Sequence, residues 1–153
     1  MAENDVLRSI MPCGCVCYTC SGCGDGVIAF HARELLRYLE GMEEFCADHS
    51  GYDGVASAMR TLRFWAAQNC PGCRENGLNH CTYENCKVCD CSKKHDVDFC
   101  YMCVEYPCEK INSVNKWRKA NDFMLKHGVQ AYFEWKKQLS HYRDYKNPNS
   151  TTS

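Results

Sequence analysis

The number and spacing of the cysteines constrain the fold of this chain more than any other feature. The chain has 15 cysteines in 153 residues, a proportion typical of proteins held together by disulfides or bound metal. Five pairs are separated by two residues, a spacing that lets a tight turn direct both sulfur atoms at one ion. This repetition predicts metal ligation. The pairs are Cys17/Cys20, Cys20/Cys23, Cys70/Cys73, Cys86/Cys89 and Cys100/Cys103.

Two features favour metal-bound thiolates over disulfides. The cysteine count is odd, and the N-terminal residues contain neither the basic region nor the apolar stretch that directs secretion. We therefore expect a cytoplasmic protein whose thiols stay reduced. The 45% hydrophobic and 24% charged residues form a globular composition. No apolar run reaches the roughly 18 residues that cross a membrane, so no membrane association is expected.

The apolar pattern predicts a mainly α-helical protein with little or no β-structure. Apolar residues recur at helical spacing from Ile28 to about Cys46, and again from Val55 to about Asn69. Helical spacing returns after Cys108, with a break at His127 and Gly128. Between these stretches the sequence is rich in cysteine and irregular, with at most one brief extended piece at residues 97–99.

We therefore expect one small metal-stabilised domain over residues 1–146 and a disordered tail over residues 147–153. Too few apolar residues lie in the Cys-rich segments to form a core there, so bound metal would have to supply their order. The expected parts are an N-terminal Cys loop (11–25), two helices (28–69), a second Cys-rich segment (70–108) and C-terminal helices (109–145).

The second Cys-rich segment has enough thiols for two closed zinc sites. A structural zinc ion takes four ligands in a tetrahedron, and eight cysteines in this segment fit two such sites. They are Cys70, Cys73, Cys81, Cys86, Cys91, Cys100, Cys103 and Cys108.

The N-terminal group also partly matches two iron–sulfur patterns. Cys13, Cys17 and Cys20 have the spacing of radical enzymes that use S-adenosylmethionine, but the β/α alternation of such enzymes is missing. Cys17, Cys20 and Cys23 match the first three ligands of a bacterial ferredoxin, and Cys70 before a proline could supply the fourth. A [4Fe–4S] cluster is therefore the alternative to zinc.

Some residues have no single interpretation. Cys46 occupies an apolar position of an expected helix, where a buried non-ligand is predicted. Histidines near the cysteines can replace a thiolate in a zinc site, although a solvated loop histidine is the more common case. The possible additional ligands are Cys15, Cys23, Cys89, His80 and His95.

Four motifs occur in order along the chain: Cys13-Gly14-x-x-Cys17-x-x-Cys20, Cys70-Pro71-Gly72-Cys73-Arg74, Cys86-Lys87-Val88-x-x-Cys91 and Phe99-Cys100-x-x-Cys103-x-x-Tyr106-Pro107-Cys108-Glu109-Lys110. Over residues 11–111 they resemble a cysteine-rich domain of unknown function from bacteria and archaea, and residues 128–138 are similar to its C-terminal helix. The resemblance implies metal binding and names no reaction. The shared cysteines that it implies are Cys13, Cys17, Cys20, Cys70, Cys73, Cys81, Cys86, Cys91, Cys100, Cys103 and Cys108.

The sequence favours a non-catalytic module that holds two or three zinc ions and binds a protein partner. Closed four-cysteine sites leave no open coordination position, and the chain has no phosphate-binding glycine loop or His-Glu-x-x-His helix. The alternatives are an iron–sulfur redox protein or small enzyme subunit, and a thiol-redox or metal-trafficking protein. Residues 109–153 hold nine basic and four acidic residues. A solvated basic face is favoured there over a nucleic-acid surface.

Overall fold

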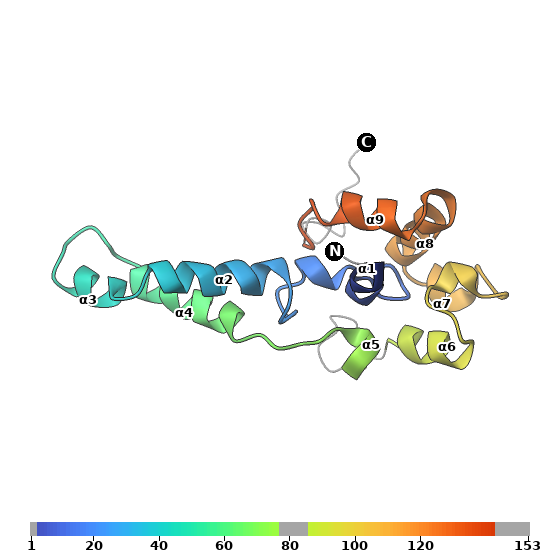
Figure 1. Ribbon diagram of the computed structural model, residues 1–153, viewed down its shortest axis with the longest axis horizontal. Helices are drawn as coiled ribbons and strands as arrows, with labels where there is room; N and C mark the ends of the chain where they lie inside the picture. Colours follow the sequence, from blue (N-terminus) through green and yellow to red (C-terminus); the bar gives the residue numbers. More distant parts are fainter. Residues whose placement is uncertain (1–2, 77–85, 143–153) are drawn as a thin grey trace. The chain divides into compact units, whose positions relative to one another are not determined.

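The computed structural model describes residues 3–76 and 86–142, which fold into helices without a β-sheet (Figure 1). Within these ranges, strand pairing is limited to isolated bridges of Ile10 with Val16 and of Cys23 with Cys70. The prediction of a mainly helical chain is confirmed. None of the described helices has the length and apolar character needed to cross a membrane.

The chain forms two compact units. Unit 1 combines Met1–Thr19 with Gly72–Ser153, and unit 2 is Cys20–Pro71. The N-terminal Cys loop expected over residues 11–25 is therefore divided, with its first cysteines in unit 1 and its last in unit 2.

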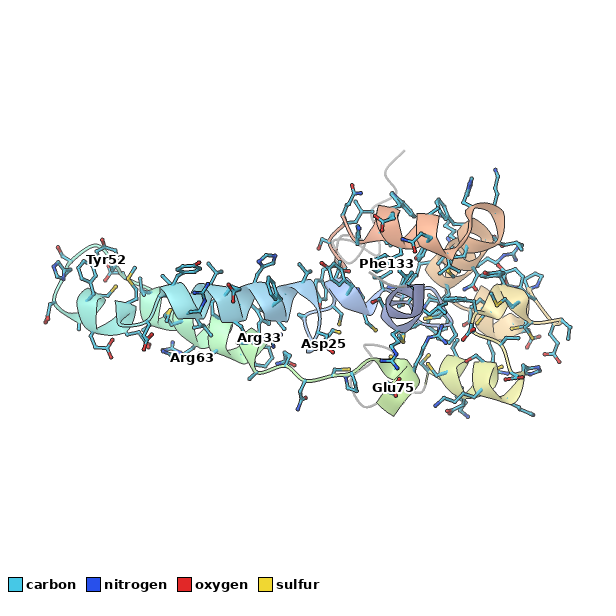
Figure 2. The ribbon with its side chains drawn as sticks, viewed as in Figure 1. Asp25, Arg33, Tyr52, Arg63, Glu75 and Phe133 are labelled. Carbon is cyan, nitrogen blue, oxygen red and sulfur yellow. The ribbon has the colours of Figure 1, made fainter. Side chains whose placement is uncertain are left out.

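Unit 2 is a helical hairpin. Helices α2 (Val27–Tyr38) and α4 (Val55–Ala66) lie side by side, and the short α3 (Met42–Ala47) lies between them in the sequence (Figure 1). Arg33 of α2, labelled in Figure 2, donates hydrogen bonds to the carbonyl oxygens of Gly24 at 2.8 Å and Ala66 at 3.2 Å. Arg33 thus connects the middle of α2 to the last residue of α4 and to the segment that precedes α2.

The single helix predicted from Ile28 to Cys46 is wrong, because the structure divides it into α2 and α3. Gly41 between them has a φ of 79°, a left-handed conformation that ends an α-helix and that glycine adopts at little cost. Apolar residues keep their helical spacing across this break. The pattern alone therefore did not reveal it.

Unit 1 is organised by its two longest helices, α8 (Asn115–His127) and α9 (Val129–Lys136), which pack against each other. Gly128 separates them with a φ of 86°, which confirms the predicted break. The last helix ends at Lys136, earlier than the apolar pattern indicated. The other helices are α1 (Glu3–Ser9), α5 (Cys73–Asn76), α6 (Val88–Lys94) and α7 (Glu109–Asn112), with 3-10 turns at Cys17–Thr19 and Cys100–Met102.

An apolar core joins the first residues of unit 1 to α8 and α9. Phe133, labelled in Figure 2, is fully buried, and the Tyr18 ring meets it edge-on with 5.8 Å between centroids. The N-terminal segment is thus built into the C-terminal helices. The buried residues of this core are Val6, Ile10, Val16, Phe99, Ala120, Met124, Tyr132 and Phe133.

Asn121 of α8 is fully buried and holds two distant loops. Its side-chain oxygen accepts a hydrogen bond from the Tyr101 N–H at 3.0 Å, and its amide nitrogen donates to the Pro12 carbonyl oxygen at 3.3 Å. The same nitrogen also donates to the Trp117 carbonyl oxygen at 3.1 Å. A buried amide whose groups are bonded in this way fixes both loops on α8.

Candidate metal centre

Cysteines from both Cys-rich segments gather in a second cluster of unit 1, which we name the cysteine core. Its apolar part is formed by Met11, Val88, Ile111 and Trp117, together with the half-buried Val114 and Tyr106. The thiols therefore occupy positions that aliphatic side chains would fill in an ordinary core. The cysteines of this core are Cys13, Cys15, Cys17, Cys73, Cys86, Cys100 and Cys108.

A tight backbone approach positions Cys13 and Cys15. Gly14 between them has a φ of 88°, and a Cβ atom there would lie 2.3 Å from the Cβ of Ala120. No larger residue fits without moving the loop off α8. From the other side, the Tyr132 hydroxyl donates a hydrogen bond to the Gly14 carbonyl oxygen at 2.7 Å.

Arg74 fixes the turn that carries Cys73. Its Nε donates to the Ile10 carbonyl oxygen at 3.0 Å, and a terminal nitrogen donates to the Asp98 carbonyl oxygen at 2.8 Å. The guanidinium carbon also lies 5.0 Å from the centroid of the Phe99 ring. One arginine thus links three parts of unit 1, a role that the sequence analysis did not assign to it.

Cys100 has four cysteine neighbours in its electrostatic environment. Burial first, and then four nearby cysteine sulfurs, raise the pKa of Cys100 to about 12. In order of effect, these neighbours are Cys108, Cys91, Cys103 and Cys86. All four were predicted ligands of the second Cys-rich segment.

A cation accompanies this group. The Lys110 ammonium donates a hydrogen bond to the Cys91 sulfur at 3.4 Å, and this contact raises the pKa of Lys110. A lysine at such a position stabilises negative charge on the sulfur.

Two further thiol pairs lie in unit 1. A hydrogen bond with the Cys15 thiol, reinforced by burial, raises the pKa of Cys13 well above its ordinary value. A hydrogen bond from Cys73 instead lowers the pKa of Cys89, and Arg74 acts in the same direction. Cys15 and Cys89, whose roles the sequence left open, are therefore direct neighbours of predicted ligands.

Unit 2 brings Cys20, Cys23 and Cys70 together. The Cys70 N–H donates to the Gly22 carbonyl oxygen at 3.2 Å, and the Gly24 N–H donates to the Cys70 carbonyl oxygen at 3.1 Å. Burial raises the pKa of Cys23, and the nearby Cys20 and Cys70 sulfurs add to the rise. The ferredoxin-like pattern in the sequence offered Cys70 as a fourth ligand beside Cys20 and Cys23, whereas the backbone pairing of Cys70 with residues 22–24 has no signal in the sequence.

The remaining candidates are Cys46 and His95, which the structure describes, and two residues outside the described ranges. Cys46 is half-buried on α3, and His95 follows the last residue of α6, where its N–H bonds the Cys91 carbonyl oxygen at 3.1 Å. Cys81 and His80 lie outside the described residues, as does the tail predicted to be disordered.

The described thiols are neighbours without forming a finished coordination shell. Over residues 3–76 and 86–142, no three His, Cys, Asp or Glu side chains are arranged to hold a metal ion. The donor chemistry nevertheless fits a soft, thiolate-binding ion, because the four side chains that act most strongly on Cys100 are all cysteines.

Comparison with known proteins gives one family match. The profile of a family described as "Protein of unknown function (DUF3795)" matches residues 9–113. This range contains every cysteine of the cysteine core. Searches of the curated proteins and of the solved structures give no significant match.

Proposed function

Because the chain belongs to the DUF3795 family, whose description assigns no activity, we propose from its own residues that it is a zinc-binding, cysteine-rich protein with a structural role. The zinc ions would hold the Cys-rich loops of unit 1 in place, and the protein would act by binding a protein partner and not by catalysis. Two or three ions are expected from the number of thiols.

The observation that carries this proposal is the set of four cysteine sulfurs around Cys100. Bringing several buried thiols together is unfavourable once they ionise, as the raised pKa of Cys100 records. A divalent cation makes ionisation of the thiols favourable, because its attraction to each thiolate outweighs the repulsion between them. The cysteines around Cys100 are already neighbours, so rotation of their side chains would be enough to complete a shell of four thiolates.

The proposed ligands of this first site are Cys100 and Cys108, with two of Cys86, Cys91 and Cys103. A zinc ion there supplies folding energy, and a closed shell leaves no position for a substrate. Lys110 would stabilise the Cys91 thiolate through the contact at 3.4 Å. Further sites would draw on the other predicted cysteines.

The deciding experiment is metal analysis of protein purified without oxygen. The proposal expects two or three zinc ions per chain by mass spectrometry and no visible absorbance. Iron and sulfide with a broad band near 400 nm (about that value for thiolate-bound clusters) would overturn zinc in favour of a [4Fe–4S] cluster. Protein that is fully folded and metal-free would overturn metal binding itself.

A second candidate is a thiol-redox or metal-trafficking protein, which the hydrogen-bonded pairs Cys13/Cys15 and Cys73/Cys89 favour. Hydrogen-bonded pairs of thiols are suited to thiol–disulfide exchange and to metal exchange. Mass spectrometry after mild oxidation tests this role: formation of one of these disulfides, reversible by a thiol reductant and accompanied by metal release, is the expected result.

A further inference from the structure

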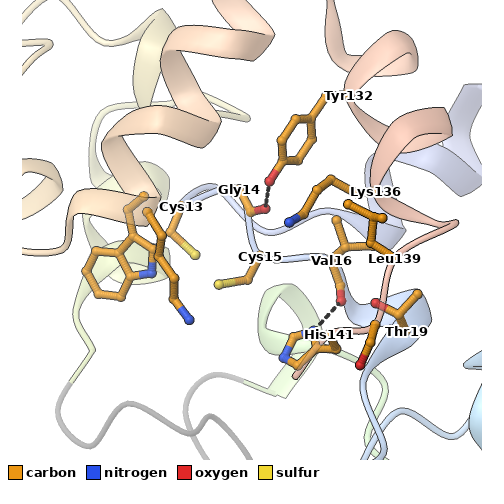
Figure 3. Close-up of a pocket in the computed structure, with 12 residues that line it drawn as sticks. Cys13, Gly14, Cys15, Val16, Thr19, Tyr132, Lys136, Leu139 and His141 are labelled. Carbon is orange, nitrogen blue, oxygen red and sulfur yellow. Dashed lines mark hydrogen bonds between the residues drawn. The ribbon is translucent and has the colours of Figure 1, made fainter. Parts of the chain in front are cut away.

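A small pocket in unit 1 lies beside the N-terminal loop (Figure 3). Its walls come from residues 13–19, from the first turn of α8, from the end of α9 and from residues 139–141. Its volume is about 60 Å³. Since a single water needs roughly 10–15 Å³ by this measure, the pocket has room for a compact ligand of a few heavy atoms.

The described residues that line this pocket include three basic side chains and no acidic one. The basic residues are Lys116 at the start of α8, Lys136 at the end of α9, and His141. Hydroxyl groups come from Thr19, which is only 6% exposed, and from Ser140. Hydroxyls and ammonium groups are hydrogen-bond donors, so the lining suits a ligand that accepts hydrogen bonds and carries negative charge.

His141 reports on the charge in this pocket. Its Nδ1 lies 3.2 Å from the Val16 carbonyl oxygen, which can only accept, so Nδ1 carries the proton of the neutral ring. Burial lowers the pKa of His141, and the charges of Lys116 and Lys136 lower it further. The other titratable groups in the lining are the Cys13 and Cys15 thiols and the Tyr132 phenol. The same positive charges that lower the pKa of His141 would attract an anion bound in the pocket.

We propose that this pocket binds a compact oxyanion of the phosphate class, either the free ion or the phosphate group of a small molecule. Lysines bind phosphate as point charges, and hydroxyls complete its hydrogen bonds. This inference rests on the lysines, the hydroxyls and the shape of the pocket, which the predicted ligand Cys13 also lines.

The test is titration of the protein, in the state in which it is purified, with inorganic phosphate in a phosphate-free buffer. Calorimetry should show saturable binding, and NMR should show an upward shift of the His141 pKa. Lys136→Gln and Lys116→Gln should each weaken binding by roughly tenfold, the usual effect of losing one charged hydrogen bond. Lys119→Gln is the matched control, because Lys119 is exposed one turn along α8 and does not line the pocket. It should bind phosphate as the unmodified protein does.

Further ligands distinguish a free ion from a phosphorylated small molecule. Other results would contradict the proposal. Tighter binding of glycerol 3-phosphate than of phosphate would indicate a phosphorylated small molecule, and the reverse order would indicate the free ion. Equal effects of phosphate, acetate and chloride would overturn the proposal, because they indicate charge screening alone. Unchanged phosphate binding in both pocket variants, or loss of metal in place of phosphate affinity, would also overturn it.

Discussion

The hydroxyl of Tyr132 lies 2.7 Å from the carbonyl oxygen of Gly14, a hydrogen bond between residues 118 positions apart in the chain. Both residues are buried, so water cannot replace the bond if it is lost. Through it, α9 holds the loop that carries Cys13 and Cys15.

Removing this hydroxyl tests how far α9 supports the loop. Tyr132→Phe should lower the free energy of unfolding by about 1–3 kcal/mol, because the buried carbonyl of Gly14 loses its donor. Chemical denaturation measures the change. Tyr38→Phe is the control, because Tyr38 is 74% exposed and its hydroxyl can bond water. Equal stability of the two variants would contradict the prediction.

The approach of Gly14 to α8 predicts a larger effect. Gly14→Ala combines left-handed strain with a Cβ only 2.3 Å from that of Ala120, and should cost about 2–5 kcal/mol. Gly54→Ala shares the strain, with a φ of 89°, but has nothing within 4 Å of the added carbon. It should cost only about 1–2 kcal/mol. A thermal melt of each variant separates the clash from the strain, and equal losses would show that α8 yields.

The zinc proposal predicts different outcomes for two cysteines. Cys100→Ser should lose about one metal equivalent and much of the stability of unit 1, since structural zinc contributes roughly 10 kcal/mol or more to such sites. Cys46→Ser, on α3 of unit 2, should keep its metal. Metal content and melting temperature are the readouts. A Cys100→Ser protein with full metal and an unchanged melt would refute the assignment.

In metal-free protein, the raised pKa of Cys100 predicts that stability falls at alkaline pH. The folded pKa of Cys100 is about 12, above the ordinary 9.0. Folding therefore favours the protonated thiol, and its contribution is complete below pH 9 and disappears as the pH rises toward 12. Urea unfolding of reduced, metal-free protein at pH 8 and 10.5 (about one and a half units above the ordinary value) should show the decline. Cys100→Ser should show a shallower one, and identical slopes would contradict the prediction.

At acid pH, protonation of Asp122 should weaken its hydrogen bond with Tyr106. The Tyr106 hydroxyl donates to Asp122 at 2.5 Å, and this bond, followed by Arg118, lowers the pKa of Asp122 below 3.8. The pair therefore stabilises the fold above pH 3.8, and its contribution falls as the pH drops through the lowered value. Tyr106→Phe should move the Asp122 titration, followed by NMR, back toward its ordinary range. An unmoved titration would show that Arg118 alone sets it.

Some of the fold could be predicted from local patterns. Gly128 ends one helical pattern and begins another, so the division between α8 and α9 was visible. Helix α6 was missed because its cysteines were interpreted only as loop ligands. Counted as apolar residues, Val88 and Cys89 form the buried face of a helix together with Ser92. That periodicity is a signal that the sequence does contain.

The candidate site was predictable in its composition but not in its connections. Of the eleven cysteines that the family resemblance implied, six lie in the cysteine core and one, Cys81, lies outside the described residues. Tertiary packing decides which sulfurs surround Cys100, and the spacing of cysteines in the sequence does not reveal it. Arg74 and Asn121 are single polar residues without a periodic partner, so no local pattern marks the bonds they make.

The bonds of Asn121 have a consequence for the two Cys-rich segments. They connect Pro12 and Tyr101, one from each Cys-rich segment, through oxygen and nitrogen atoms alone. The two segments are therefore brought together by a contact that requires no sulfur and no ion. In the proposed zinc protein, these bonds would limit how far the two segments separate when the ion is absent.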